Sequence, residues 1–229
     1  MTNQKTVVIS LGGSLIVPDE IQTAFLKEFK KFVLKFIKKD YRFVVVTGGG
    51  SICRKYQKAA AAVSKLTDED KDWLGIHATR LNAHLIRTIF KKEAYPVVLD
   101  SPHKPISTKR YSLYIASGWK PGWSTDFDAV VLAKRFKAQK IVNLSNIDYI
   151  YDKNPKLFKD AKPIKEMKWP EYLKIVGNKW VPGMNAPFDP IASKIAKAAR
   201  MTVVFVEGTN LENLANVLTN KKFKGTIIA

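Results

Sequence analysis

The sequence predicts an α/β fold class, a three-layer α/β/α sandwich around a mainly parallel central sheet. Apolar runs typical of strands alternate with helical patterns along the chain, and such alternation requires crossover connections between parallel strands. Two runs, Phe43–Val46 and Val203–Val206, are apolar at every position, as expected for strands buried on both faces. The chain has 229 residues, 46% of them hydrophobic, which is enough for one full core. We therefore expect a single domain over 1–229.

The first half of the chain predicts two strand–helix units followed by a long helix. Glycine-rich turns separate each strand from its helix, and a Thr–Asp capping box opens the long helix. In order, the predicted elements are a strand at Thr6–Leu11, a helix at Pro18–Lys39, a strand at Arg42–Val46, a helix through Ile52, Tyr56 and Val63, and a helix capped by Thr67.

Apolar spacings of three and four residues assign the buried faces of two of these helices. The helix at Pro18–Lys39 is expected to bury Ile21, Phe25, Phe29, Phe32, Val33 and Phe36. The helix after Thr67 is expected to bury Trp73, Leu74, Leu81, Leu85 and Ile89.

The second half of the chain continues the alternation of strands and helices. Two polar stretches that contain Pro and Lys, Ser101–Tyr111 and Tyr149–Lys168, are expected to be loops or small lids. In order, the predicted elements are strands at Tyr95–Leu99 and Tyr111–Ala116, a helix at Thr125–Phe136, a strand at Lys140–Leu144, a helix at Ile191–Ala199, a strand at Thr202–Val206, a helix at Leu211–Leu218 and a strand at Thr226–Ile228.

Charge and composition narrow the classes of partner. Lysine and arginine outnumber aspartate and glutamate by 39 to 20, a formal net charge of +19, which predicts attraction to anions such as nucleotides. The excess is spread along the chain and forms no basic block, so we expect no specific nucleic-acid partner. There is one cysteine, Cys53, no secretory signature and no apolar run as long as a membrane helix, so we expect a cytoplasmic protein without a membrane partner.

Two glycine clusters follow the first two predicted strands, namely Gly12-Gly13-Ser14 and Gly48-Gly49-Gly50-Ser51. Glycine lets the backbone approach an anion closely, and free N–H groups at a helix start point toward it. Each cluster alone could be only a tight turn, but parallel strands end at the same edge of a sheet, where ligands bind. Neither a P-loop motif nor a G-x-G-x-x-G motif occurs, which disfavours those two nucleotide folds.

Two further clusters contribute polar side chains. Lys120–Asp126 combines a Pro-Gly turn, two hydroxyls and a carboxylate at a helix start. These groups could simply cap the helix, or they could form a second phosphate cradle in which Asp126 organises Mg²⁺ or a lysine. Asn143–Pro155 leaves a buried strand and enters a polar loop, where Tyr151 could pack beside a nucleobase. No group of His, Cys, Asp and Glu has the spacing of a metal site, so no residue is assigned as a metal ligand.

These four clusters, in this order, resemble the amino acid kinase family, and within it the archaeal-type uridylate (UMP) kinases, over nearly the whole chain. The most specific piece is Asp72–Ala83, with an Asp, a Gly-Ile pair and a Thr-Arg-x-Asn-Ala run. Val46–Tyr56 is similar to the family's glycine triplet followed by an arginine. Pro121–Asp126 is similar to its Pro-Gly-x-(Ser/Thr)-Thr-Asp loop, and Asp189–Lys194 to its late Asp-Pro-x-Ala-x-Lys turn.

The resemblance implies an enzyme that transfers the γ-phosphoryl group of ATP to UMP, with Mg²⁺ as cofactor. It also implies an acceptor-binding part over roughly 1–125, an ATP-binding part over roughly 126–229, and a homo-oligomer, a hexamer built as a trimer of dimers. The implied catalytic residues are Asp126 and Arg54. The implied ATP-binding residues are Gly12, Gly13, Ser14, Gly50, Arg54, Ser145, Tyr151 and Asn154. The implied UMP-binding residues are Gly49, Asp72, Lys120, Pro121, Gly122, Trp123, Ser124, Thr125 and Asp126.

The sequence departs from the family pattern at three places. Many members carry a lysine two residues before the Gly-Gly pair, where this chain has Ser10, so another cation, for which Lys194 is a candidate, would hold the γ-phosphate. Tyr149 stands where the family has a glycine, and Asn154 stands where it has an aspartate. These changes bear on nucleotide preference more than on the fold.

Other functions stay open at this point. A kinase for another small phosphate, such as isopentenyl phosphate, would share the fold, but those enzymes carry a histidine just after the glycine triplet, where this chain has Arg54. An ATP-binding protein similar to the molybdenum storage proteins is kept open by Ser10 and Asn154. A nucleic-acid-binding protein is indicated by charge alone.

Overall fold

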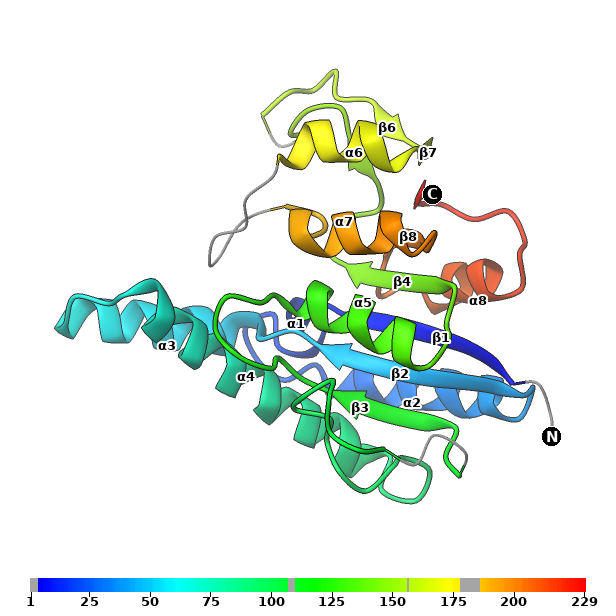
Figure 1. Cartoon of the computed structure of the whole chain (residues 1–229), viewed down its shortest axis with the longest axis horizontal. Helices are drawn as coiled ribbons and strands as arrows, with labels where there is room; N and C mark the ends of the chain where they lie inside the picture. The colour runs from blue at the N-terminus through cyan, green and yellow to red at the C-terminus, as the bar shows by residue number, and fades with distance from the viewer. Residues whose placement is uncertain (1–3, 107–109, 156, 178–185) are drawn as a thin grey trace.

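The computed structural model describes residues 4–106, 110–155, 157–177 and 186–229, and confirms the predicted fold class. A mainly parallel sheet lies between two layers of helices (Figure 1). The strands are β1 (Lys5–Leu11), β2 (Tyr41–Thr47), β3 (Leu113–Ala116), β4 (Lys140–Ser145), β5 (Ile150–Tyr151), β6 (Pro163–Ile164), β7 (Glu166–Met167), β8 (Thr202–Glu207) and β9 (Thr226–Ile228). The helices are α1 (Gly13–Ile16), α2 (Thr23–Ile37), α3 (Gly50–Val63), α4 (Asp68–Ile89), α5 (Thr125–Arg135), α6 (Trp169–Val176), α7 (Pro190–Ala198) and α8 (Leu211–Leu218).

The order of the strands places β1 and β4 at the centre of the sheet. Among the described residues, the sheet runs β3-β2-β1-β4-β8-β9-β7, and β8 and β9 are its antiparallel pair. The short strands β5 and β6 form a separate antiparallel pair. Since β2, β1 and β4 are parallel neighbours, the loops after their carboxyl ends leave the sheet at the same edge.

Two hydrophobic clusters fill the space on either side of the sheet. Successive residues of β1 point to opposite faces, so Val7 and Ile9 join one cluster and Val8 joins the other. Helices α2, α4 and α8 cover the first face, and α5, α6 and α7 cover the second (Figure 1). Burial on both faces explains why the central strands are apolar at almost every position.

The helix expected at Pro18–Lys39 forms over the shorter range Thr23–Ile37, as α2, and the short helix α1, which was not predicted, precedes it. The aromatic stripe is confirmed for Phe29, Phe32 and Phe36, which are buried, but Ile21 precedes α2 and is 48% exposed, so its predicted burial is wrong. The physical reason is the chain reversal after α1, which ends before Ile21 and leaves that side chain in a surface turn.

The capping box at Thr67 is confirmed, but the buried face predicted for α4 is partly wrong. Trp73 and Leu81 are 40% and 59% exposed, whereas Thr79, Asn82 and Ala83 are buried. The helix turns this small and polar face inward because it packs against the loops that follow β2 and β3, where hydrogen-bonding groups are needed. Leu74, Leu85 and Ile89 are half-buried.

The strand predicted at Tyr95–Leu99 does not form as a continuous strand. Only Ala94 and Leu99 make isolated bridges to β3, because Pro96 has no N–H group to donate to a ladder. The stretch predicted as a loop at Tyr149–Lys168 contains β5, β6 and β7, and α6 was not predicted.

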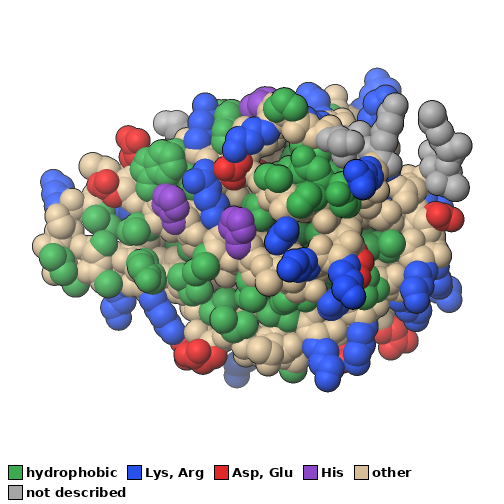
Figure 2. Space-filling model, turned by 90° about the horizontal axis from the view of Figure 1, so that it is seen from below, with side chains coloured by type: hydrophobic (Ala, Val, Ile, Leu, Met, Phe, Trp, Pro, Cys, Tyr) green, Lys and Arg blue, Asp and Glu red, His purple; other side chains and the backbone are tan. Residues whose placement is uncertain are grey.

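Helix α3 extends beyond the edge of the sheet (Figure 1), and among its residues only Ser51 is buried. Figure 2 shows lysine and arginine side chains scattered among apolar and acidic ones on the face seen from below, without a continuous basic block there. Among the described residues, no helix is both long and apolar enough to cross a membrane.

Candidate active site

The two glycine clusters meet at the carboxyl ends of β1 and β2. Leu11 pairs with Thr47 in the parallel ladder, so the two loops start side by side. A Cβ atom on Gly13 would lie 2.0 Å from the backbone nitrogen of Gly50 and 2.6 Å from the carbonyl carbon of Gly48. Only residues without a side chain permit this approach, and Gly50 also has a φ of 66°.

Helix α4 fixes the glycine triplet and the loop after β3 at once. The Asn82 side-chain amide donates hydrogen bonds to the carbonyl groups of Gly48, at 2.8 Å, and Gly49, at 3.2 Å. The hydroxyl of Thr79 accepts a hydrogen bond of 2.9 Å from the Gly118 N–H group. The Thr-Arg-x-Asn run therefore positions two loops through groups that are buried and satisfied.

A cavity of about 540 Å³ opens where these loops meet α3, α4 and α5, a volume within the range of small-molecule sites of roughly 300–1,000 Å³. It brings together residues from both the ATP-binding and the UMP-binding sets implied by the sequence. The lining residues are Gly49, Gly50, Cys53, Arg54, Gln57, Lys71, Asp72, Gly75, Ile76, Thr79, Gly118, Trp123, Ser124, Thr125, Asp126, Ala186 and Asp189.

Asp126, in the first turn of α5, connects this cavity to the ends of β1 and β4. Its Oδ1 atom accepts a hydrogen bond of 3.2 Å from the Ser10 hydroxyl and lies 3.5 Å from the side-chain nitrogen of Asn143. Its Oδ2 atom accepts a hydrogen bond of 3.2 Å from the N–H group of Asp189.

Burial raises the pKa of Asp126 to about 7. The N–H group of Asp189 opposes the rise, the carboxylate of Asp189 adds to it, and the Ser10 hydroxyl opposes it. A carboxylate in this state gains strongly from any cation brought beside it, because a nearby positive charge favours the ionised form.

The loop between β3 and α5 is held from both sides. The Asp72 carboxylate accepts a hydrogen bond of 2.8 Å from the Gly122 N–H group. The Trp119 N–H group donates to the Asp128 carboxylate at 3.2 Å, and its carbonyl accepts from the Arg80 guanidinium at 3.1 Å. Burial raises the pKa of Asp128 to about 8, the Trp119 N–H group opposes the rise and the charge of Asp126 adds to it. The loop is therefore tied to α4 and to α5.

Within this loop the predicted residues separate into two groups. Lys120, Pro121 and Gly122 do not line the cavity, and the Lys120 ammonium lies 4.4 Å from the centre of the Trp119 ring. The Ser124 hydroxyl accepts a hydrogen bond of 3.2 Å from the Phe127 N–H group and so caps α5, while it also lines the cavity. Trp123, Thr125 and Asp126 line the cavity as well.

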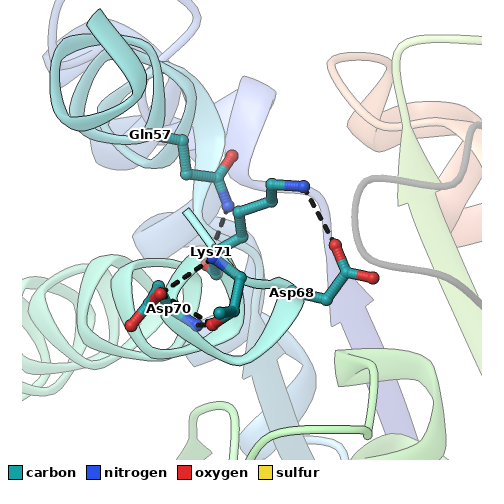
Figure 3. A network of polar contacts seen from close by, with 5 residues as sticks. Gln57, Asp68, Asp70 and Lys71 are labelled. Carbon is teal, nitrogen blue, oxygen red and sulfur yellow. Dashed lines mark hydrogen bonds and ion pairs between the residues drawn. The ribbon is translucent and has the colours of Figure 1, made fainter. Parts of the chain in front are cut away.

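A polar network at the start of α4 supports the part of the cavity wall that Gln57 and Lys71 form (Figure 3). The Gln57 amide donates a hydrogen bond of 2.8 Å to the carbonyl of Lys71, and the Lys71 ammonium pairs with Asp68 at 2.9 Å. Asp70 accepts a hydrogen bond of 2.8 Å from the Thr67 N–H group and completes the capping box. Asp68 thus offsets the charge of Lys71, and Arg54 is a second lining cation, for which no ion pair is seen in the part of the chain that the structure describes.

The residues implied for the adenosine side lie around the loop after β4 and do not line the cavity. The Ser145 hydroxyl accepts from the Ile147 N–H group at 3.3 Å, and the Tyr151 hydroxyl donates to Asp148 at 2.9 Å. Asn154 is exposed. The first glycine loop lies next to this region, because the Gly12 N–H group donates to the Leu144 carbonyl at 2.9 Å. Ser14 follows Gly13 in α1 and is half-buried.

Sequence reasoning missed several groups around the cavity. Gln57 and Lys71 belong to helices without a motif at those positions. Ser10 and Asn143 were noted from the sequence, but spacing along the chain carried no signal for their contacts with Asp126, which they reach from separate strands. Lys194 is exposed on α7 and does not line the cavity. Burial raises the pKa of the Cys53 thiol, which disfavours the reactive thiolate form.

Comparison with known proteins places this geometry in a family. The sequence profile described as "Amino acid kinase family" matches residues 5–207. The "Uridylate kinase" of Methanocorpusculum labreanum is 33% identical over 227 residues, which cover 97% of this chain and 94% of that protein. The "Uridylate kinase" of Thermococcus sibiricus is 30% identical over 224 residues, which cover 97% of this chain and 98% of that protein.

Solved structures agree with the sequence comparison. The crystal structure of uridylate kinase from Archaeoglobus fulgidus superposes with a TM-score of 0.79 and 30% identity, and covers 97% of this chain and 99% of that one. UMP kinase from Ureaplasma parvum superposes with a TM-score of 0.76 at 18% identity over the full length of both chains, which is evidence for the fold alone. The chain therefore belongs to the amino acid kinase family.

Proposed function

We propose that this protein is a UMP kinase that transfers the γ-phosphoryl group of ATP to UMP and so contributes to pyrimidine nucleotide biosynthesis. The observation that carries the proposal is the meeting of the two glycine loops beside one cavity, which Gly50 and Asp126 both line. Relatives at 30–33% identity over nearly their full length are uridylate kinases, which supports the acceptor.

Transfer of a phosphoryl group between two nucleotides depends on the positions of the two phosphates and on neutralisation of their charge more than on a general base. The second pKa of a phosphomonoester is roughly 6, so the attacking oxygen of UMP is already largely deprotonated at neutral pH. Backbone N–H groups of the two glycine loops would hold the ATP phosphates, and Arg54 would neutralise charge on the transferring group. Asp72, with one oxygen bonded to Gly122, keeps its other oxygen for the ribose hydroxyls of UMP.

The groups around Asp126 fit Mg²⁺ bound together with ATP. Mg²⁺ prefers hard oxygen ligands and is commonly held by one or two carboxylates plus substrate phosphates, and Asp126 offers a carboxylate beside the Ser10 hydroxyl. The described residues contain no group of three His, Cys, Asp or Glu that would hold a metal alone. When bound, Mg²⁺ would neutralise phosphate charge, as the lysine does that many family members carry at the position of Ser10. Asp126 would hold the ion.

The remaining implied residues would serve the two nucleotides. Gly12, Gly13, Ser14 and Gly50 would contact the ATP phosphates. Ser145, Tyr151 and Asn154 would line the adenosine side. Gly49 and the segment Lys120–Asp126 would wrap the UMP phosphate and base.

A coupled ADP-release assay with ATP and Mg²⁺ tests the proposed acceptor. We expect ADP release above the buffer rate with UMP, and much less with other nucleoside monophosphates or with isopentenyl phosphate. ADP release with isopentenyl phosphate but not with UMP would reject the proposed function. Retention of molybdenum by the purified protein without turnover of UMP would favour a storage role instead.

We also propose that the chain acts as a cytoplasmic homo-oligomer. Four large apolar side chains are exposed on α3 and α4, namely Tyr56, Val63, Trp73 and Leu81, at 63%, 90%, 40% and 59%. Such a surface favours association. A hexamer built as a trimer of dimers is the expected form, and light scattering would measure it.

A further inference from the structure

A second hollow, of about 690 Å³, lies between α8, β7 and the loop before β9, and it shares no lining residue with the candidate active-site cavity. Its walls combine four lysines, three asparagines, two glutamates and three apolar residues. They are Tyr149, Lys165, Glu166, Asn210, Glu212, Asn213, Asn216, Lys221, Lys222, Phe223, Lys224, Gly225 and Ile227.

The loop Lys221–Gly225 is fixed in its conformation by helix α8. The buried side chain of Asn213 donates a hydrogen bond of 2.7 Å to the Lys224 carbonyl and accepts one of 2.8 Å from the Lys224 N–H group. The Lys221 N–H group donates to the Asn216 carbonyl at 2.8 Å. Gly225 has a φ of 155°, and a Cβ atom there would lie 2.2 Å from the Phe205 carbonyl oxygen. The loop backbone is therefore preorganised, and its lysine side chains extend into solvent.

The charged groups of the hollow are left without mutual neutralisation. Lys165, Lys221, Lys222 and Lys224 are exposed, and two carboxylates, Glu166 and Glu212, share the wall. Over the part of the chain that the structure describes, none of these six side chains takes part in an ion pair. Four cations against two anions leave a net positive hollow that attracts anions.

Aromatic and amide groups distinguish this hollow from a merely solvated basic surface. Tyr149 and Phe223 are half-buried in its wall and offer ring faces on which a nucleobase can stack. The Asn210 side-chain oxygen caps α8 by accepting a hydrogen bond of 2.9 Å from the Asn213 N–H group, which leaves its NH₂ group, together with the Asn216 side chain, for base edges or ribose hydroxyls.

We infer that this hollow is a second binding site, for a nucleoside polyphosphate, whose base stacks on Phe223 and Tyr149 and whose phosphates contact Lys221, Lys222 and Lys224. A single nucleotide is favoured over a nucleic-acid strand, because Glu166 and Glu212 in the same wall would repel a continuing phosphate backbone. The volume also lies within the range for a small ligand, roughly 300–1,000 Å³. The inference does not rest on the proposed function, since the two sites share no residue.

Equilibrium dialysis of the full chain with labelled ATP, CTP, GTP and UTP tests this site by counting bound nucleotides per chain. In Lys222→Glu/Lys224→Glu, the number of bound nucleotides per chain should fall by one for at least one of the four nucleotides, or that nucleotide should bind to the second site at least tenfold more weakly. The matched variant Lys27→Glu/Lys35→Glu, which makes the same charge change on exposed lysines of α2, should bind like the wild type. If the active site binds no ATP, the wild type would show one equivalent and the loop variant none, so failure of the proposed function is distinguishable.

A second variant separates base recognition from simple charge. Phe223→Ala should weaken nucleotide binding at this site at least tenfold and leave the affinity for inorganic triphosphate unchanged. Unchanged binding in Lys222→Glu/Lys224→Glu, or equal loss in the α2 control, would overturn the inference. The inference would also be overturned if inorganic triphosphate bound as tightly as every nucleotide. An affinity for single-stranded RNA that rises with the length of the RNA and is lost in Lys222→Glu/Lys224→Glu would overturn it as well. Circular dichroism of each variant checks the fold.

Discussion

Replacing Gly13 with alanine perturbs the contact between the two glycine loops directly. The new Cβ atom would lie 2.0 Å from the Gly50 nitrogen, whereas ordinary contacts begin near 3.4 Å, so the loops must separate by about 1.4 Å. Overpacking of this kind costs about 1–3 kcal/mol of unfolding free energy. Misplacing reacting groups by about 1 Å costs roughly a hundredfold in rate. We therefore expect kcat/KM for UMP to fall about a hundredfold in Gly13→Ala.

The assay is steady-state ADP release, paired with thermal unfolding of the same preparation. Gly177→Ala serves as the control, because Gly177 caps α6 away from the cavity at a φ of 77° with nothing near its Cβ position. This variant should lose about 1–3 kcal/mol of stability through backbone strain and keep its turnover. Wild-type turnover in Gly13→Ala, at equal or lower stability than Gly177→Ala, would refute the reasoning that the loops must touch.

Three further predictions concern the carboxylates and the helix surface. Asp126→Asn should lower turnover at least tenfold without unfolding the protein, and a variant that keeps the wild-type rate would remove Asp126 from the site. Since the pKa of Asp126 is about 7, wild-type kcat/KM should rise with pH toward 7 and level off above it. For Asp128, whose pKa is about 8 in the folded chain against an ordinary 3.8, the folded state holds the proton more tightly, so the contribution of Asp128 to stability should fall between about pH 4 and 8, by at most about 1.4 kcal/mol per pH unit. In urea unfolding, Asp128→Asn should remove this contribution and leave the fall below about pH 7 that Asp126 adds; a stability–pH curve parallel to that of the wild type would contradict it. Leu81→Glu, on the exposed face of α4, should shift light scattering toward smaller species without lowering stability, and an unchanged mass would exclude this face from the interface.

Most of the fold follows from periodicity because the central strands and the outer helices have a simple environment. β1, β2, β4 and β8 are buried on both faces, and α8 lies on the sheet with one apolar side, so local pattern and tertiary position agree. The pattern failed in α4, where the buried side faces polar loops and carries Thr79 and Asn82. The pattern failed again at Pro96. Its β-branched neighbours favour a strand, but proline lacks the N–H group that a continuous strand would need there.

The site could be predicted as far as its motifs extend along the chain. The glycine clusters and the segment ending at Asp126 are local signals, and the parallel order of β1 and β2 brings the glycines together. The contacts of Asp126 could not be predicted from the sequence, because Ser10 and the Asp189 N–H group approach it from segments more than sixty residues away along the chain. No spacing rule connects such positions.

The most direct measurement of the central claim is a crystal structure of the protein with UMP, Mg²⁺ and a non-hydrolysable ATP analogue. The UMP phosphate should lie in the cavity lined by Gly49 and Asp126. The γ-phosphate of the analogue should lie over the junction of Gly13 and Gly50, in line with the UMP phosphate. Nucleotides bound on opposite sides of the sheet, or a UMP phosphate far from Gly13 and Gly50, would contradict the account.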